Sequence, residues 1–174
     1  MSQGQTTYLL DQRPAVAGMP FDDSPADDET FMAAEDLPMG VLVRMKADQS
    51  GVETVKSDAG NIVGVVLYQE FFQQGLPASS GANVIKAGTP VAVRRKGRVW
   101  MQWDGTSVTA FDQKLNTPSA AGTPATQGQA SSTATSANVV RTANIWCCRV
   151  PKASGDVGPD GSQQLIGVTV SYPS

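Results

Sequence analysis

The stretch GTPVAVRRKGRVWMQWDG, residues 88–105, decides how the fold is interpreted. Four of the chain's 13 basic residues occupy five positions here, and two tryptophans follow at once. These residues are Arg94, Arg95, Lys96, Arg98, Trp100 and Trp103. Glycine supplies the positive φ that a two-residue hairpin turn needs. We therefore predict a β-hairpin with its tip at Lys96 and Gly97.

In this hairpin Val93 faces Trp100, which is a favourable cross-strand pair, whereas Arg95 faces Arg98. Like charges placed opposite each other destabilise a hairpin, and such a tip often meets a carboxylate partner. Three interpretations compete: a solvated tip, a nucleic-acid patch in which the aromatic rings stack on bases, and a protein interface. Because Arg and Trp are enriched at the energetic centres of interfaces, we favour the protein interface.

Composition restricts the classes of function. With 174 residues, 17% charged residues and a net charge of −3, the chain suits one domain and lacks the basic excess of a protein that coats nucleic acid. Histidine is absent, which removes the commonest general base and the commonest zinc ligand. We therefore predict no catalytic, metal-binding or cofactor-binding residues, and no enzyme activity.

The two cysteines, Cys147 and Cys148, are adjacent in the sequence. Neighbouring residues of a strand point to opposite faces of the sheet, so these two are poorly placed to bridge each other. We expect two small strand side chains, with an intermolecular disulfide left open as the alternative.

Residues 1–39 are predicted to form an extended, acidic, proline-rich arm, because closely spaced prolines exclude a long helix. Seven of the 16 acidic residues lie between positions 22 and 36: Asp22, Asp23, Asp27, Asp28, Glu29, Glu35 and Asp36. Apolar side chains such as Phe21 and Phe31 suggest that the arm docks onto something, with a solvated tail as the alternative.

The chain starts without a signal-peptide pattern, and its longest apolar run, residues 62–68, is too short to span a bilayer. We expect a protein made in the cytoplasm, with no membrane partner.

From residue 40 onward the pattern is that of short strands. Candidate strands are residues 40–47, 51–57, 61–72, 139–150 and 164–172, with further strands within 82–103. Residues 116–138 contain no charge and no large apolar side chain, so we predict a long loop that is ordered only where something covers it. The predicted fold is mainly β, a jelly-roll-like sandwich or a small β-barrel, with a β domain over residues 40–174.

Three quoted segments resemble the structural cement proteins, or head decoration proteins, of tailed bacteriophages. They are IKAGTPVAVRRKGRVWM at 85–101, GNIVGVVLYQ at 60–69 and LPMGVLVRM at 37–45. The resemblance covers roughly residues 14–110. It implies a β-rich protein that assembles as dimers or trimers, the dimer being favoured, and uses no cofactor. It further implies that the protein binds the outer capsid surface of the virion, where major capsid proteins meet, and holds the shell against the pressure of packaged DNA.

On this reading, the basic hairpin of one subunit pairs with the acidic arm or other carboxylates of a neighbour. The predicted interface residues are Arg94, Arg95, Arg98, Trp100, Trp103, Phe21, Phe31, Asp27 and Asp28. The predicted partners are the major capsid protein and a second copy of the chain. No specific nucleic acid is expected.

Three rival functions remain open. The first is another β-domain of the virion, in a tail, baseplate or fibre. The second is a small β-barrel that binds nucleic acid, for which binding should be strongly salt-sensitive. The third is an enzyme with a carboxylate pair from residues 22–36 or 104–112, which we rate lowest because acids on a flexible arm are poorly preorganised.

Overall fold

The computed structural model describes residues 16–56, 61–69, 84–118, 128–136, 139–149, 156–157 and 164–173. Its strands are β1 (Asp27–Met32), β2 (Leu37–Pro38), β3 (Leu42–Met45), β4 (Val52–Thr54), β5 (Ile62–Val66), β6 (Val84–Ile85), β7 (Pro90–Gln102), β8 (Lys114–Pro118), β9 (Val139–Arg149), β10 (Asp156–Val157) and β11 (Gln164–Ser171). These described ranges hold no helix of the length and apolarity needed to cross a membrane.

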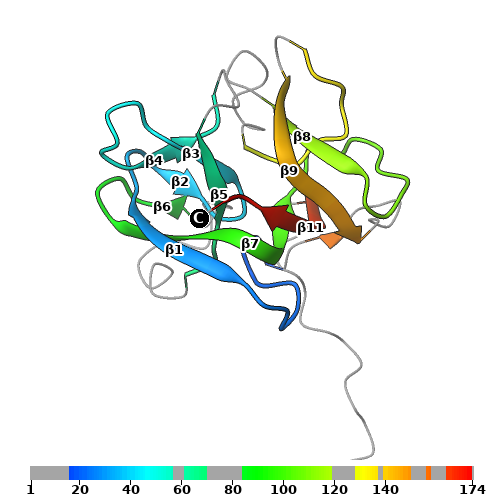
Figure 1. Cartoon of the computed structure of the whole chain (residues 1–174), viewed down its shortest axis with the longest axis horizontal. Helices are drawn as coiled ribbons and strands as arrows, with labels where there is room; N and C mark the ends of the chain where they lie inside the picture. The colour runs from blue at the N-terminus through cyan, green and yellow to red at the C-terminus, as the bar shows by residue number, and fades with distance from the viewer. Residues whose placement is uncertain are drawn as a thin grey trace, which may run out of the picture.

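Nine of the strands form one antiparallel sheet in the order β4-β3-β5-β7-β11-β9-β8, with β1 beside β7 and β10 beside β11. Strands β2 and β6 form a second, two-stranded sheet. The large sheet curls into a half-barrel: β3 and β4 lie at one end of the molecule, β8 and β9 at the other, and β7 and β11 connect them (Figure 1). The prediction of a mainly β chain with barrel-like closure is confirmed.

The predicted hairpin at Lys96 and Gly97 is wrong. Both residues lie inside β7, a single strand of 13 residues. Its first half pairs with β1, from Asp27 opposite Lys96 to Met32 opposite Pro90. Its second half pairs with β11. Each half thus finds a partner elsewhere in the chain, and Gly97, with a φ of 118°, bends the strand without reversing it.

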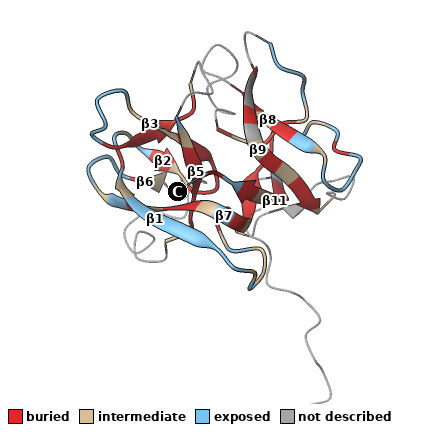
Figure 2. Cartoon of the chain, in the orientation of Figure 1, coloured by how far each residue is buried: buried red, intermediate tan, exposed pale blue. Residues whose placement is uncertain are grey.

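Two hydrophobic cores lie on either side of the sheet formed by β3, β5 and the first half of β7. Val91 and Val93 pack into one core, which we call the arm core because it also contains Leu37 from the arm. Val99 and Met101 pack into the other core, which we call the barrel core. Buried side chains therefore run along β5, β7 and β11 through the middle of the molecule (Figure 2). One long strand belongs to both cores, which joins the two ends of the half-barrel.

Strand β5 is buried on both faces, as its apolar run predicts. Val63 and Val66 belong to the arm core, whereas Val65 belongs to the barrel core. The glycine between them, Gly64, packs so closely that a Cβ atom placed there would collide with the backbone carbonyl of Arg94. The register of β3 against β5 also shifts beside Gly64. Gly64 therefore marks a close approach of two backbones, next to an irregularity in the strand register.

The described part of the N-terminal arm, residues 16–39, is more regular than its prolines predict. It contains the exposed strand β1, because the prolines at 25 and 38 leave a gap long enough for six extended residues. Its apolar side chains Leu37 and Met39 are buried in the arm core. The predicted docking therefore includes contacts with the chain's own β body. Residues 1–15 lie outside the described ranges, and the domain boundary at residue 39 stays a prediction.

The small-residue segment is held through its backbone. Of residues 116–138, the structure describes 116–118 and 128–136. Ala130 donates a hydrogen bond to the carbonyl of Gln102 at 2.8 Å, and the carbonyl of Gly128 accepts one from Leu42 at 2.8 Å. Ala130 and Ser131 are fully buried. Small side chains allow this close backbone packing. The sequence prediction considered only the burial of large apolar side chains and did not include such backbone contacts.

Replacing Gly64 with alanine should destabilise the fold by about 1–3 kcal/mol, because the new methyl group overpacks a rigid backbone contact. The control is Gly88→Ala, since a Cβ at Gly88 meets nothing within 4 Å. That control should cost only the backbone strain of its positive φ, about 1 kcal/mol. Urea unfolding of the two variants measures the difference. A Gly64→Ala variant no less stable than Gly88→Ala would contradict the packing argument.

Candidate interface site

Strand β1 places carboxylates opposite the basic cluster of β7. In the antiparallel register Asp27 lies opposite Lys96, and Asp28 lies opposite Arg94. Side chains on β1 are exposed from Asp27 to Thr30. The pairing of the two strands is visible along the lower edge of the molecule in Figure 1. The fold thus brings the acidic arm and the basic stretch together within one chain.

Arg94 and Asp28 form a two-point ion pair. The Nε of Arg94 donates to Oδ1 of Asp28 at 2.8 Å, and its Nη2 donates to Oδ2 at 2.9 Å. The remaining nitrogen, Nη1, donates to the backbone carbonyl of Arg98 at 2.8 Å. The side chain of Arg94 is only 6% exposed, whereas that of Asp28 is 37% exposed. A guanidinium buried to this degree needs such a fork of acceptors to offset its lost hydration.

Arg95 and Arg98 have acid partners in the arm as well. Arg95 donates to the carboxylate of Glu29 and to the backbone carbonyl of Pro173. The Nε of Arg95 is buried and has no hydrogen-bond partner among the described residues. Arg98 donates to Asp22 at 2.8 Å. Hydrogen bonds from Ser24 and Arg98 hold the pKa of the Asp22 carboxyl below its ordinary value of 3.8.

Most of the arm's negative charge is balanced within the chain. Five of the seven acidic residues between positions 22 and 36 make ion pairs with basic residues of the same chain. They are Asp22, Asp28, Glu29, Glu35 and Asp36. The partners of the arginine cluster are therefore supplied in cis, through the pairing of β1 with β7. The contact predicted between subunits is not required to balance these arginines.

The two tryptophans of the basic stretch are buried. Trp100 is 9% exposed and packs on Phe21, with ring centroids 5.0 Å apart at an interplanar angle of 44°. The guanidinium carbon of Arg149 lies 5.3 Å from the Trp100 ring centroid. Trp103 is 8% exposed and belongs to the barrel core. Neither ring presents a free face for stacking on a nucleic-acid base, which such a site needs.

Two other predicted interface residues stay accessible. Asp27 is exposed beside Lys96, and Phe31 is half-buried against the arm core. Sequence reasoning did not single out the side chains that the fold exposes most. Among the described residues the exposed large hydrophobic side chains are Phe111, at 59%, and Met32, at 44%. The exposure of Phe111 could have been predicted from the sequence, because this aromatic residue lies within the short polar run TAFDQ, residues 109–113.

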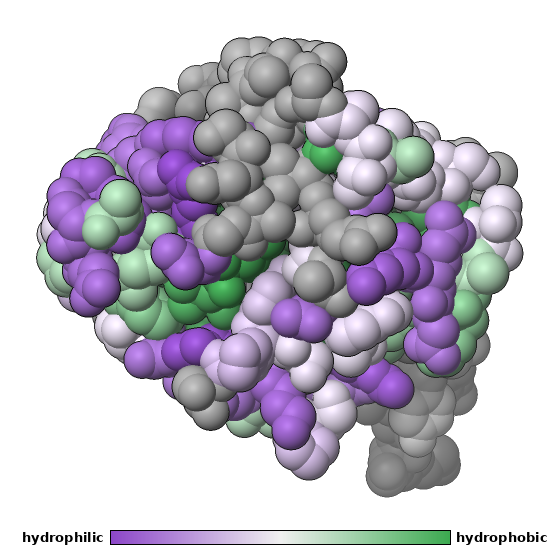
Figure 3. Space-filling view, turned by 45° about the horizontal axis from the view of Figure 1, so that its top comes forward, coloured by the Kyte–Doolittle hydropathy of each residue, from purple (hydrophilic) through white to green (hydrophobic). Residues whose placement is uncertain are grey.

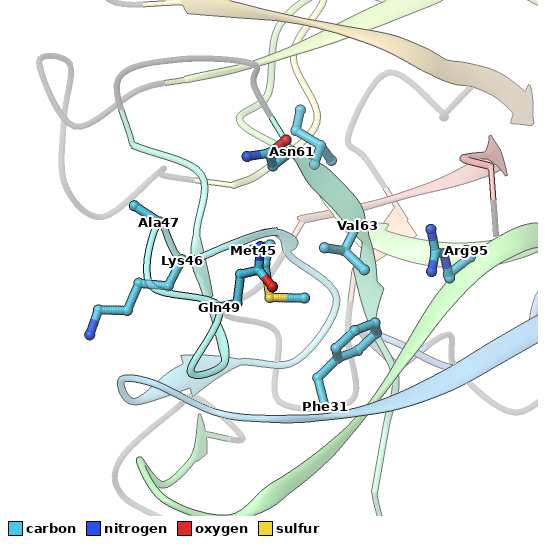
Figure 4. A pocket seen from close by; sticks show the side chains of 9 residues that line it. Phe31, Met45, Lys46, Ala47, Gln49, Asn61, Val63 and Arg95 are labelled. Atoms are coloured by element: carbon cyan, nitrogen blue, oxygen red, sulfur yellow. The ribbon is translucent and has the colours of Figure 1, made fainter.

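A hollow of about 300 Å³ lies beside β1, between the turn after β3 and the start of β5. Figure 4 shows Phe31, Met45 and Val63 around it, with Arg95 on the side of β7. Lys46, Gln49 and Asn61 supply polar groups at its edge. On the face shown in Figure 3, hydrophilic residues border separate hydrophobic areas. The hollow thus brings two predicted interface residues, Phe31 and Arg95, to one place.

Comparisons with known proteins identify one family and one shared fold. Residues 4–170 match the family described as structural cement protein (E217 gp24/Pam3 gp6). A solved chain described as "The capsid of Myoviridae Phage XM1" superposes with a TM-score of 0.67 at 15% identity, covering 98% of each chain, which shows a shared fold. No curated protein matches. The resemblance drawn from residues 37–45, 60–69 and 85–101 is confirmed.

Removing the carboxylate of Asp28 should destabilise the chain. Asp28→Asn leaves the buried guanidinium of Arg94 without its charged acceptor, at a cost of about 1–3 kcal/mol. Asp27→Asn is the matched control on the same strand, and it should change stability by less than about 0.5 kcal/mol because Asp27 is exposed. Chemical denaturation compares the two. Equal effects would mean that the ion pair contributes nothing specific.

Proposed function

The chain belongs to the structural cement protein family of phages, and from this premise we propose that it binds the outer surface of the major capsid protein shell. There it stabilises the head against the internal pressure of packaged DNA. Its place in the virion and its structural role in the capsid follow from the family, whereas the shell protein as partner and the outer face are the proposal. The match over residues 4–170 is the observation that carries it.

The physical mechanism is linkage. A protein that binds the assembled shell and not the dissociated subunits shifts the equilibrium toward the intact shell, by an amount that grows with its concentration over its dissociation constant. A homo-oligomer, for which we propose a dimer before a trimer, attaches at more than one point. Once one subunit is bound, the second subunit is held near its own site on the shell, and this high effective concentration strengthens the overall binding. Neither step requires turnover or a cofactor.

We assign the shell-facing contact to the exposed residues 27–30 of β1, which lie outside the hollow lined by Phe31. Asp27, Asp28 and Glu29 form an exposed acidic row, and within the described residues β1 pairs with no strand other than β7. The ion pairs to β7 hold this row on a rigid strand, which lowers the conformational entropy that binding would otherwise cost. Asp28 and Glu29 pair with Arg94 and Arg95 but keep 37% and 49% of their side chains exposed, so that together with Asp27 they can still contact a basic surface.

The features of the site weigh against the nucleic-acid alternative. A binder of DNA or RNA gains affinity by presenting free basic groups to phosphates. Here Arg94, Arg95 and Arg98 are each engaged by a carboxylate of the same chain. The neighbouring tryptophans are buried as well.

The test is co-sedimentation with purified, expanded heads that lack this protein, at moderate and high salt. We expect saturable binding at a fixed ratio to the major capsid protein. Thr30→Lys, which adds a positive charge to exposed β1, should weaken binding by about tenfold or more. Thr135→Lys adds the same charge at an exposed position outside β1 and should bind like the parent chain.

Absence of binding to heads would overturn the proposal, and binding to tails in its place would assign the chain to another part of the virion. Equal loss of binding in Thr30→Lys and Thr135→Lys would leave the shell as partner but remove β1 from the contact.

A further inference from the structure

Phe111 is the most exposed large apolar side chain in the described part of the molecule, and it is held on a well-defined turn. The backbone nitrogen of Asp112 donates to the carbonyl of Cys147 at 2.9 Å, and that of Cys147 donates to the carbonyl of Gln113 at 2.9 Å. The side chain of Gln113 also accepts a hydrogen bond from Thr109, at 3.0 Å. These bonds hold the backbone on either side of Phe111, whose side chain is 59% exposed and therefore contributes little burial to the isolated chain.

Asp112 follows Phe111 on the same turn. It has a φ of 59° and an exposed side chain. No hydrogen bond or ion pair is recorded for its carboxylate among the described residues. The turn therefore presents an apolar ring and a negative charge next to each other, on a preorganised backbone. A complementary site has an apolar floor with a cation at its edge.

The hollow beside β1 has these two properties. Its floor is made by Phe31, Met45 and Val63, of which the first two are partly buried hydrophobic side chains on the arm core. Lys46 and Arg95 supply cations at its edge. Its volume of about 300 Å³ is ample for one aromatic ring, since a cavity of about 150 Å³ holds benzene.

Of the two cations at the edge of the hollow, Lys46 is the one available to a carboxylate from outside. Lys46 pairs with Asp48 at 2.9 Å, but both side chains are well exposed, at 42% and 55%, so this pair is weak and exchangeable. Arg95 is already engaged by Glu29 and by the carbonyl of Pro173, so its guanidinium closes one side of the hollow without being free to bind a further carboxylate.

The turn and the hollow lie at opposite ends of one molecule. The segment before β8 is at one end of the long axis in Figure 1, and the turn after β3 is at the other end. One chain therefore does not bring its own turn to its own hollow. Complementary sites that are separated in this way can meet only between different copies of the protein.

We propose that the turn bearing Phe111 and Asp112 in one copy seats in the hollow formed by Phe31, Met45 and Val63 in a second copy. The ring fills the apolar floor, and the carboxylate of Asp112 faces Lys46. This inference rests on the proposed function, because decoration of a shell is what brings copies to high local concentration. Contacts between neighbouring bound copies would link their binding sites on the shell, so that the binding of one copy favours the binding of the next.

Cysteine cross-linking on decorated heads tests the contact. The double variant Ala110→Cys/Ala47→Cys keeps Phe111 and places one thiol beside it on the turn and one at the edge of the hollow, since Ala110 and Ala47 are both exposed. Oxidation should give disulfide-linked species at about tenfold the yield of Ala110→Cys/Ala87→Cys, whose second thiol is at an exposed alanine outside the hollow. The native Cys147 and Cys148 are buried and contribute little. If the contact forms a closed two-fold dimer, the cross-linked species has twice the mass of the monomer. If it forms an open array, species of successively higher mass appear. Either result supports the proposed contact.

The amount of protein bound to the heads is measured in the same samples. Bound protein that cross-links no better than the control pair would overturn the proposed contact and leave the proposed function standing. Absence of bound protein would overturn the proposed function. As an independent readout, Phe111→Ala should lower the steepness of the binding curve, whereas Thr109→Ala, at an exposed position two residues earlier in the same segment, should keep it.

Discussion

The pairing of one long strand, β7, with different partners along its length is the constraint on which the rest of the structure depends. Its first half lies between β1 and β5, and its second half pairs with β11. The bend at Gly97 lets the odd-numbered side chains Val93 and Val99 enter two different cores. Both cores and β1 depend on the backbone of β7. A substitution that distorts one end of β7 is therefore expected to destabilise both cores and the attachment of β1.

The electrostatics follow from this pairing. A strand that contained Arg94, Arg95 and Arg98 without partners would be a cationic surface suited to phosphate. The antiparallel register of β1 supplies one carboxylate to Arg94 and one to Arg95, and Asp22 of the preceding segment supplies the third. These ion pairs stabilise the attachment of the arm, and Asp27 and the solvent-exposed parts of Asp28 and Glu29 remain at the surface of β1. This arrangement fits a structural protein that recognises another protein, as expected in a family of capsid cement proteins.

Sequence reasoning reached the fold class and the family but not the path of the chain through the basic stretch. The strands at 139–150 and 164–172 were predicted because their residues are β-branched and alternate, and β9 and β11 lie there. The hairpin at Lys96 and Gly97 was wrong because a glycine with positive φ serves a bend as well as a turn, and only distant strands decide between them. The burial of Trp100 and Trp103 was missed for the same reason. Composition alone does not predict that Phe21 packs on Trp100 of β7. Nor does it predict that residues 130–131 form backbone hydrogen bonds with the end of β7 and with β8.

The central claim is that this chain stabilises a phage head from the outside by bridging its shell subunits. A three-dimensional reconstruction of heads saturated with the purified protein tests it most directly. The account predicts added density on the outer face, over boundaries between major capsid proteins, into which the half-barrel fits with β1 toward the shell. Density confined to the inner face, or to the centre of single shell subunits away from their boundaries, would contradict it.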